Sequence, residues 1–422
     1  MSRFLIAASA LSFAATVQAA TSWIPTSPLI QIGDDLDIFT DSSLAVEATD
    51  NLYSQASGRS ATFFTISPGI TLEYGRETGF EVTLLARRGF VQFTDSGLRG
   101  LNDTRDILSG KIRLSTGGPL TLSLDTSYRE TARNDDLAQQ GITGSTIGTN
   151  LLRQTNYNHA LDADYRLTER VQLGLGVNRS YNHYNNPTIL VDAGTGTQTY
   201  NTNALTEIDT VSIPVEIEYQ AFEKVWFGFR YQRDQADYEA APYFDSTGAA
   251  RAALPGRLTK DFYGLTTRGQ LTSSGKLTGT ARIGLLDYAN EGSPSDNTVS
   301  WSVSLNHALT EILSHNLTLS RDVTASSTGG QNDSIAYTYG LSMNVAEGLG
   351  LSLSVSRNET EATNGGTVTP VNTMVYTLGA DFKYNEHLTL NAGYNFTDSR
   401  ITSNPAGNFN SNTFTLSAAF RY

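Results

Sequence analysis

Histidines and paired carboxylates are the residues of this chain that could take part in catalysis or bind a metal ion. None of the five histidines belongs to an HExxH motif or to another metal-ligand spacing, and no GxSxG nucleophile motif occurs. Glu216 and Glu218 share a strand face at positions i and i+2, as a glycosidase pair could, but charge on a wetted strand face also explains them. The chain has no Cys, which excludes thiol catalysis and Cys-based metal sites. We therefore expect no enzymatic activity, no cofactor and no bound metal.

The first residues have the pattern of a secretory signal peptide. Arg3 gives the positive start, residues 4–17 form an apolar stretch, and Val17-Gln18-Ala19 offers a small-residue cleavage site. The apolar stretch is too short for a membrane-spanning helix, and no longer one follows it. We predict a signal peptide over 1–19, and any residence in a membrane must then come from strands.

The elements that must position the remaining residues are strands, because one alternating pattern repeats from residue 42 to residue 422. In the last segment, Phe414 and Leu416 fall on one face, and Thr415 and Ser417 fall on the other. The alternating stretches are longer than soluble strands of about five or six residues and suit strands that cross a membrane. About 18 stretches are expected, at roughly 42–53, 60–75, 78–93, 104–116, 119–133, 152–167, 170–185, 205–220, 224–239, 257–272, 275–290, 296–309, 313–327, 333–346, 349–363, 371–384, 387–401 and 410–422.

The connections between these stretches fall into tight turns and long segments in alternation. In known outer-membrane barrels the periplasmic turns are short and the external loops are long. Placing Tyr422 at the periplasmic end puts every tight turn there, and we expect residues 20–41 to be a periplasmic lead-in. The sequence therefore predicts an all-β fold, a transmembrane antiparallel up-and-down β-barrel over 42–422. The tight turns are centred on 117–118, 168–169, 273–274, 347–348 and 385–386, and the long segments are 134–151, 186–204, 240–256, 364–370 and 402–409.

Charged residues on the wetted face would line the lumen of such a barrel. At about 18 strands the interior is too wide for side chains to fill, so an aqueous channel results unless it is plugged. The net charge of -13 argues against nucleic acid as a partner and leads to the hypothesis of a weak cation preference, the alternative being charge that is merely solvated. The loop 134–151 could constrict the pore or remain an exposed loop. By alternation, the candidate pore-lining residues are Glu73, Arg113, Asp125, Arg129, Glu216, Glu218, Arg230, Arg282, Asp381 and Lys383.

Tyrosines also recur at one level of the expected barrel. They lie near strand ends beside the proposed periplasmic turns, where amphipathic rings suit the lipid headgroup level. Ordinary β-propensity explains one such residue but not their shared position. We expect an aromatic girdle that includes Tyr74, Tyr219, Tyr384 and Tyr422.

Two short segments resemble known families. The opening Pro28-Leu29-Ile30-Gln31-Ile32-Gly33-Asp34-Asp35-Leu36-Asp37-Ile38-Phe39, followed by Asp50-Asn51-Leu52-Tyr53, resembles the start of the β-barrel porin family of the second type. Phe420-Arg421-Tyr422 resembles the terminal aromatic signal of Gram-negative outer-membrane proteins, which implies that Phe420 and Tyr422 form an assembly signal for the barrel-assembly machinery. The resemblance implies an integral outer-membrane protein and a passive channel, and some relatives accompany exopolysaccharide export.

Three hypotheses for the function follow. The leading one is a porin-like channel in the cell outer membrane for passive diffusion of ions and small hydrophilic solutes, with outer-membrane lipid around it. The second is a structural or interaction barrel, a surface adhesin or an accessory to exopolysaccharide export, that acts through its long external loops. The third is a soluble β-protein, for which the face that we assign to lipid would instead be buried.

Overall fold

The structure, a computed structural model, describes most of the chain beyond its first residues. The expected signal peptide over 1–19 lies outside the described residues, as does nearly all of the loop 134–151. Among the described residues, no helix is both long and apolar enough to cross a membrane. The described part is 27–422 apart from 55, 57, 76–77, 116, 133–150, 152, 186–187, 193–196, 202–206, 240–242, 245–249, 252–255, 327–329, 365–366 and 403–404.

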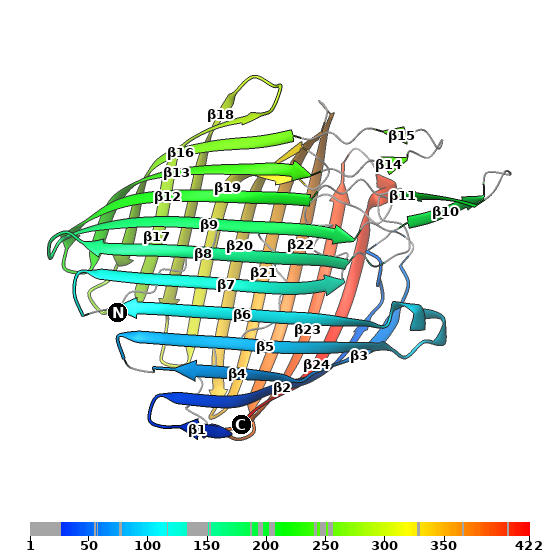
Figure 1. Ribbon diagram of the computed structural model, residues 1–422, viewed down its shortest axis with the longest axis horizontal. Coiled ribbons are helices and arrows are strands. Elements are labelled where there is room, and N and C mark those ends of the chain that lie inside the picture. The colour runs from blue at the N-terminus through cyan, green and yellow to red at the C-terminus, as the bar shows by residue number, and fades with distance from the viewer. Residues whose placement is uncertain are drawn as a thin grey trace.

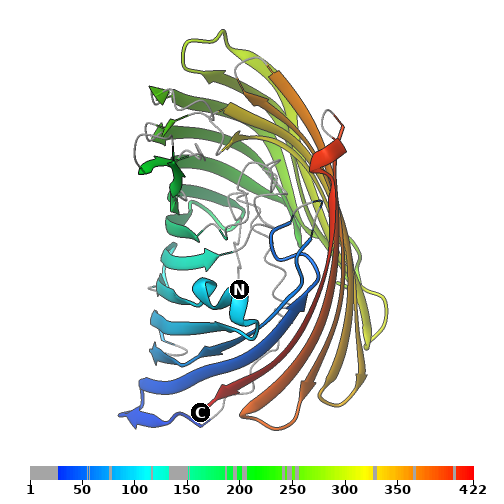
Figure 2. The ribbon, with the colours of Figure 1, turned by 90° about the vertical axis from the view of Figure 1, so that its right-hand side faces the viewer.

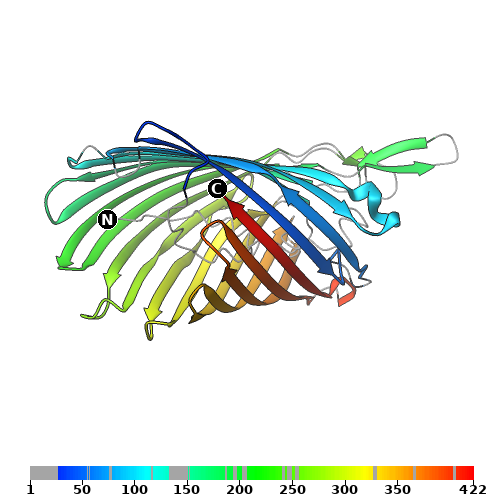
Figure 3. The ribbon, with the colours of Figure 1, turned by 90° about the horizontal axis from the view of Figure 1, so that it is seen from below.

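One antiparallel sheet forms the wall and closes on itself (Figures 1 and 2). The ring closes where β2 (Leu36–Thr49) pairs with β24 (Phe409–Arg421), which lie side by side in Figure 3. β3 (Ala61–Ser67) and β4 (Gly69–Tyr74) together make one wall strand interrupted at Pro68, because both pair with β2 on one side and β5 on the other. β1 (Ile30–Ile32) pairs with β2 as a short addition. The wall is therefore a closed barrel of 18 strands, and the predicted fold is confirmed.

The remaining wall strands follow one another in chain order, each paired with the next. They are β5 (Phe80–Phe93), β6 (Asp103–Ser115), β7 (Leu120–Ala132), β8 (Arg153–Arg166), β9 (Val171–Asn185), β12 (Glu207–Phe222), β13 (Val225–Glu239), β16 (Gly256–Gln270), β17 (Leu277–Asn290), β18 (Asp296–Ala308), β19 (Leu313–Ser326), β20 (Gly330–Ala346), β21 (Leu349–Asn364), β22 (Thr367–Lys383) and β23 (Leu388–Ile401). Early strands form one side of the barrel and late strands form the opposite side (Figure 2).

The start of the barrel differs from the prediction. We expected the first strand at 42, but β2 begins at Leu36, so part of the expected lead-in 20–41 belongs to the wall. The physical reason is that Leu36 and Ile38 continue the alternation of β2 and pair with Tyr74 and Leu72 of β4. The acidic and proline-containing surroundings had suggested a lead-in.

The two ends of the barrel carry different connections. We call the end with β-turns such as 223–224 and 347–348, where Tyr422 lies, the turn end, and the opposite end the loop end. At the loop end, 94–102 contains the 3-10 helix η1 (Ser96–Leu101), and 402–408 contains the shorter η2 (Pro405–Gly407). The hairpins β10 (Thr188–Asp192) with β11 (Thr197–Asn201) and β14 (Tyr243–Phe244) with β15 (Ala250–Arg251) also lie there (Figure 1).

The predicted long loop 364–370 is wrong. β21 extends to Asn364 and β22 begins at Thr367, so only two residues separate these strands. Pro370, in the expected loop, pairs with Glu361 inside the sheet, and its carbonyl accepts a hydrogen bond from the Thr402 amide at 3.2 Å. The longer connections at the loop end therefore come mainly from the first half of the chain.

Side chains alternate between an outward and an inward face along every wall strand. Outward positions carry large apolar side chains that are exposed around the middle of the barrel, such as Leu265 at 64% and Leu416 at 48%. The inward neighbours of Leu416 are Thr415 and Ser417. A closed sheet satisfies its backbone hydrogen bonds internally, and an exposed apolar band then suits the hydrocarbon of a membrane. The alternation that predicted the strands is the alternation that the structure shows.

Candidate functional site: a lumen with two unlike walls

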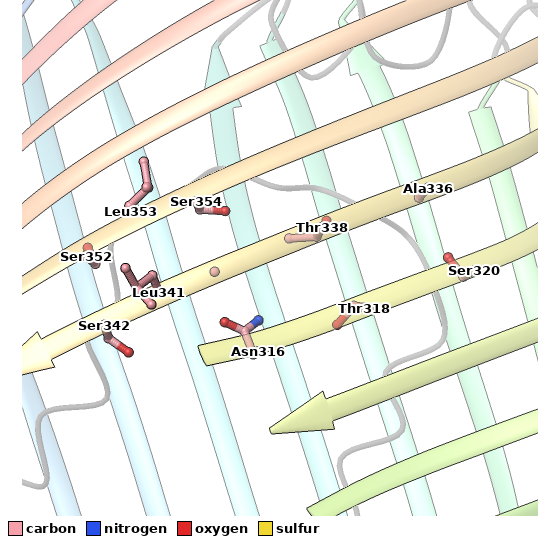
Figure 4. A pocket seen from close by; sticks show the side chains of 11 residues that line it. Asn316, Thr318, Ser320, Ala336, Thr338, Leu341, Ser342, Ser352, Leu353 and Ser354 are labelled. Atoms are coloured by element: carbon pink, nitrogen blue, oxygen red, sulfur yellow. The ribbon is translucent and has the colours of Figure 1, made fainter. Parts of the chain in front are cut away.

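The inner face of the late strands is polar and largely uncharged. On β19, β20 and β21 the inward side chains are mainly hydroxyls, amides and single methyl groups, and a hollow of about 270 Å³ lies against them (Figure 4). Small polar side chains leave room for water and offer hydrogen-bond donors and acceptors to it. The residues that line the hollow are Asn316, Thr318, Ser320, Ala336, Thr338, Gly340, Leu341, Ser342, Ser352, Leu353 and Ser354.

The inner face of β12, β13 and β16 carries a ladder of ion pairs instead. Arg230 donates to Glu216 across 3.4 Å, and Arg268 makes a two-pronged contact with Glu218 at 2.7 and 2.8 Å. Thr266 adds a hydrogen bond to Glu216 at 2.5 Å. Glu218 is 4% exposed and Arg230 is 6% exposed. Each is paired with a side chain of opposite charge, so the ladder has little contact with lumen water.

At the loop end the lumen is filled on one side. β19 pairs with β18 only as far as Arg321, and the rest of β19 turns inward and packs on the inner face of β16 and β17. There Val323 is fully buried against Phe262 and Leu286. A second buried cluster of Ile208, Ala236, Tyr238 and Leu258 continues this contact along β12 and β13. We call this contact across the lumen the seam.

Lys260 lies at the centre of the seam. Its ammonium donates to the Val323 carbonyl at 2.7 Å and lies 3.1 Å from Asp234 of β13 and 3.8 Å from Asp322 of β19. Arg282 of β17 also approaches Asp322, at 3.9 Å. A buried ammonium must be paired because its desolvation costs several kcal/mol. Lys260 therefore ties strands from two sides of the barrel together.

Further polar contacts extend the seam beyond Lys260. The Tyr238 hydroxyl donates to the Gly330 carbonyl at the start of β20, and the Asn290 amide donates to Gln331 at 2.8 Å.

On the other side of the loop end, Leu98 of η1 is buried against Phe63 and Phe93, which point inward from β3 and β5. Two apolar clusters therefore narrow this end of the lumen.

The predicted pore-lining residues divide into two groups. Arg113 and Asp125 face the lumen with about two fifths of each side chain exposed, and they pair with Glu81 at 3.9 Å and Lys111 at 3.5 Å. The enclosed group comprises Glu216, Glu218, Arg230 and Arg282 in the ladder and seam, together with Glu73, which pairs with Arg421. Arg129, Asp381 and Lys383 share the inward face by alternation, and Asp381 sits against Gly350.

The sequence analysis missed several inward charges. Asp162 and Asp164 of β8 lie opposite Gly176 and Gly174 of β9, and a Cβ on Gly176 would come within 2.7 Å of an Asp162 carboxylate oxygen. The absence of side chains at these glycines makes the room for both carboxylates. Lys260, Asp234, Asp322 and Arg268 were missed as well. The available signal was Leu258 and Phe262, apolar residues on the supposedly wet face that flank Lys260.

The histidines and tyrosines occupy places that the sequence only partly indicated. His307 and His315 share a hydrogen bond of 3.1 Å between neighbouring strands β18 and β19. In the described part of the chain, no group of three His, Cys, Asp or Glu side chains could hold a metal ion. Tyr74, Tyr219 and Tyr384 are exposed at the turn end, and the Tyr422 ring lies 4.8 Å from the ring of His387. These positions fit the expected girdle.

Comparisons with known proteins do not give the chain a family. No protein-family model matches it, and no curated protein matches it. Solved structures that resemble it include OccK1 (OpdK) of Pseudomonas aeruginosa, with 14% identity, a TM-score of 0.48 and coverage of 92% of this chain and 99% of that one. The ferric-catecholate import receptor Fiu of E. coli K12 matches with 10% identity, a TM-score of 0.46 and coverage of 90% and 82%. The FrpB iron transporter of Neisseria meningitidis matches with 11% identity, a TM-score of 0.47 and coverage of 86% and 62%.

Proposed function

We propose that the protein is a porin-like channel of the outer membrane through which ions and small hydrophilic solutes diffuse passively. The observation that carries the proposal is the polar, uncharged inner face of β19–β21, with its hollow of about 270 Å³. A wall of hydroxyl and amide groups replaces hydration water without binding any one solute tightly, which favours passage. The barrel-assembly machinery would recognise Phe420 and Tyr422, both of which point outward and are exposed.

A weak cation preference forms part of this proposal. Asp125, Asp162 and Asp164 face the lumen from β7 and β8, and Lys111 is the nearest cation paired with them, at 3.5 Å from Asp125. Arg230 and Arg268 also interact with Asp162 and Asp164, but each is already paired with Glu216 or Glu218, so the carboxylates outnumber the cations and this stretch of the wall has a negative potential. A lumen wall of one sign concentrates counter-ions and favours their passage.

Single-channel recording on refolded protein in planar bilayers tests the channel itself. We expect discrete, ohmic conductance steps. A barrel that is folded, as shown by its resistance to unfolding in detergent without heating, yet stays silent would refute the proposal.

Reversal potentials under a salt gradient test the preference. The double variant Asp162→Asn/Asp164→Asn should shift the reversal potential toward the unselective value of zero. Asp398→Asn is the matched control, because Asp398 lies on the outward face beside Arg400. Clear anion preference in the unmodified channel, or equal shifts in both variants, would contradict the assignment.

A second candidate function rests on the β10–β11 hairpin. Its five paired positions carry the chain past the rim of the barrel (Figure 1), where a partner could reach it. An adhesin or an accessory to exopolysaccharide export would use such a projection. Replacing residues 188–201 by a short Gly/Ser linker should abolish cell-surface binding in that case while leaving conductance intact. Binding that survives the replacement would exclude this role for the hairpin.

A further inference from the structure

Arginine–carboxylate pairs recur on the outward face, in the loop-end half of the strands. Arg88 of β5 contacts Asp106 of β6 through Nε and Nη2, both at 2.7 Å. This contact leaves the Nη1 edge of the guanidinium directed away from Asp106. We call the whole set of outward pairs the ionic belt. Its pairs are Arg88–Asp106, Arg153–Glu130, Arg179–Asp209, Arg233–Asp261, Arg257–Asp237, Arg357–Glu359 and Arg400–Asp398.

The belt is most elaborate on β5 to β8. Glu130 accepts hydrogen bonds from the Asp106 amide at 3.0 Å, from Arg153 at 2.7 Å and from the Tyr128 hydroxyl at 2.5 Å. These contacts hold the guanidinium groups and the tyrosine in fixed places on the surface. A fixed guanidinium loses less entropy when it binds an anion than a mobile one does.

A row of tyrosine rings connects this cluster to the next belt arginine. Tyr128, Tyr157 and Tyr181 lie on neighbouring strands with ring centroids 5.0 and 5.9 Å apart. Arg179 follows on β9 with its two-pronged contact to Asp209 at 3.0 and 2.6 Å. The side chains of Arg88 and Arg179 are each 60% exposed, so both cations are accessible from outside the barrel.

The surface changes in a fixed order from the belt toward the middle of the barrel. On β6, Leu108 is the next outward residue after Asp106. On β7 and β8, Thr126 and His159 come first and share a hydrogen bond of 2.7 Å, and Leu124 and Leu161 follow them. All three leucines are exposed. At the turn end, the outward side chains are instead aromatic, as with Tyr74, Phe80, Tyr165, Tyr219 and Phe420. The two ends of the described outer surface therefore suit headgroup layers of different chemistry, and at the loop end guanidinium groups lie on the same strands as the apolar band.

We propose that the ionic belt on β5–β9 binds a lipid whose headgroup carries a phosphate monoester, in the leaflet at the loop end. Arg88 and Arg179 would bind phosphate oxygens through the parts of their guanidinium groups that face outward, because each side chain is 60% exposed and guanidinium matches phosphate geometry. The tyrosine hydroxyl groups lie between them at the glycerol or sugar level, and the acyl chains would lie along Leu108, Leu124 and Leu161. This inference does not depend on whether the lumen conducts.

Native mass spectrometry of the detergent-solubilised full chain tests the proposal. Dioleoyl phosphatidic acid is the probe, and dioleoylglycerol, which has the same acyl chains without phosphate, is its reference. We expect saturable binding of phosphatidic acid that is at least about tenfold tighter than binding of dioleoylglycerol. Arg88→Gln/Arg179→Gln should bring the two affinities to within about twofold, on the scale of one or two charge-assisted hydrogen bonds.

Arg113→Gln is the matched control, because it removes the same charge from a half-exposed arginine on the inward face. Loss of phosphatidic acid binding in the double variant alone supports the proposal. Unchanged binding in the double variant, an equal loss in the Arg113→Gln control, or no preference of the unmodified protein for phosphatidic acid would each overturn it. Melting curves of all variants in detergent confirm that the compared proteins are folded.

Discussion

Replacing Lys260 by methionine should loosen the seam. Met keeps much of the aliphatic length of the side chain but removes the ammonium group that lies between Asp234 and Asp322. The side chains of all three residues are less than one fifth exposed, so solvent compensates little for the lost charge. We expect the loop-end part of β19 to separate from β16 in this variant.

The size of the effect follows from the geometry. Both carboxylates lie within 3.8 Å of the ammonium nitrogen, so their nearest oxygens are at most about 7 Å apart. Two unit charges at that separation repel by about 2 kcal/mol at an effective dielectric constant near 20. The Val323 carbonyl loses its buried donor, which costs a further 1–3 kcal/mol or so. A total loss of about 3–5 kcal/mol agrees with what breaking a buried ion pair usually costs.

Equilibrium unfolding in urea, with the protein in lipid vesicles, measures this loss, and single-channel recording measures the opening of the lumen. Lys260→Met should lower the free energy of unfolding by about 3–5 kcal/mol and raise the conductance. The triple variant Lys260→Met/Asp234→Asn/Asp322→Asn should recover at least half of that loss, because the repulsion between the two carboxylates is removed. Recovery should stay incomplete, because Arg282 loses Asp322 as its partner.

Lys111→Met is the control for loss of a lumen cation. Lys111 pairs with Asp125 at 3.5 Å, but about half of each side chain is exposed, so the loss should stay below about 1 kcal/mol. If Lys260→Met and Lys111→Met cost the same, or if the triple variant is no more stable than the single one, the account of the seam is refuted.

Three further predictions concern other parts of the barrel. Leu416→Arg should cost about 2–4 kcal/mol in vesicle unfolding and Thr415→Arg less than 1, because only Leu416 faces hydrocarbon; equal costs would contradict the face assignment. The hydrogen bond from the Gly97 amide, and after it the one from Arg59, lowers the pKa of the Asp95 carboxyl group. The stability that Asp95 gives to η1 is therefore fully present above pH 3.8, the pKa in the unfolded chain, and is lost as the pH falls through the lower pKa of the folded state. Cleavage by pepsin within 94–102 should therefore rise in that range, and Asp95→Asn should remove the pH dependence. Gly348→Val should cost at least about 1–2 kcal/mol in urea unfolding, because the backbone φ of +76° is left-handed; an unchanged midpoint would count against that turn geometry.

The wall of the barrel could be predicted from the sequence because its two faces meet different solvents. Apart from β2 and the interruption at Pro68, the wall strands begin and end within four residues of their expected bounds. In β23 (Leu388–Ile401), apolar side chains alternate with polar or small ones from Leu388 to Thr397, and a shift of one residue would place the apolar side chains of this part in the lumen. The residue pattern of each strand is therefore enough to determine which of its side chains face outward.

The candidate site was less accessible to the same reasoning. Alternation placed Glu218 and Arg230 on the inward face, but it treated that face as uniformly wet. Whether an inward charge meets water or another wall depends on β19 bending across the lumen toward Lys260, and that contact joins residues 63 positions apart. Periodicity within one strand carries no information about such a contact. The apolar residues Leu258, Phe262 and Leu286 on the inward face were the one local sign of the packed side.

The closure of the ring between β2 and β24 has a consequence for how the protein can fold. The amides and carbonyls of Thr40 and Tyr422 hydrogen bond to each other at 2.7 and 3.1 Å, although 382 positions separate them in the chain. Until these two segments meet, each leaves a row of unpaired peptide groups, which hydrocarbon tolerates poorly. Insertion and closure must therefore be nearly simultaneous, and a chain shortened by β24 would expose two adhesive edges and be prone to aggregate.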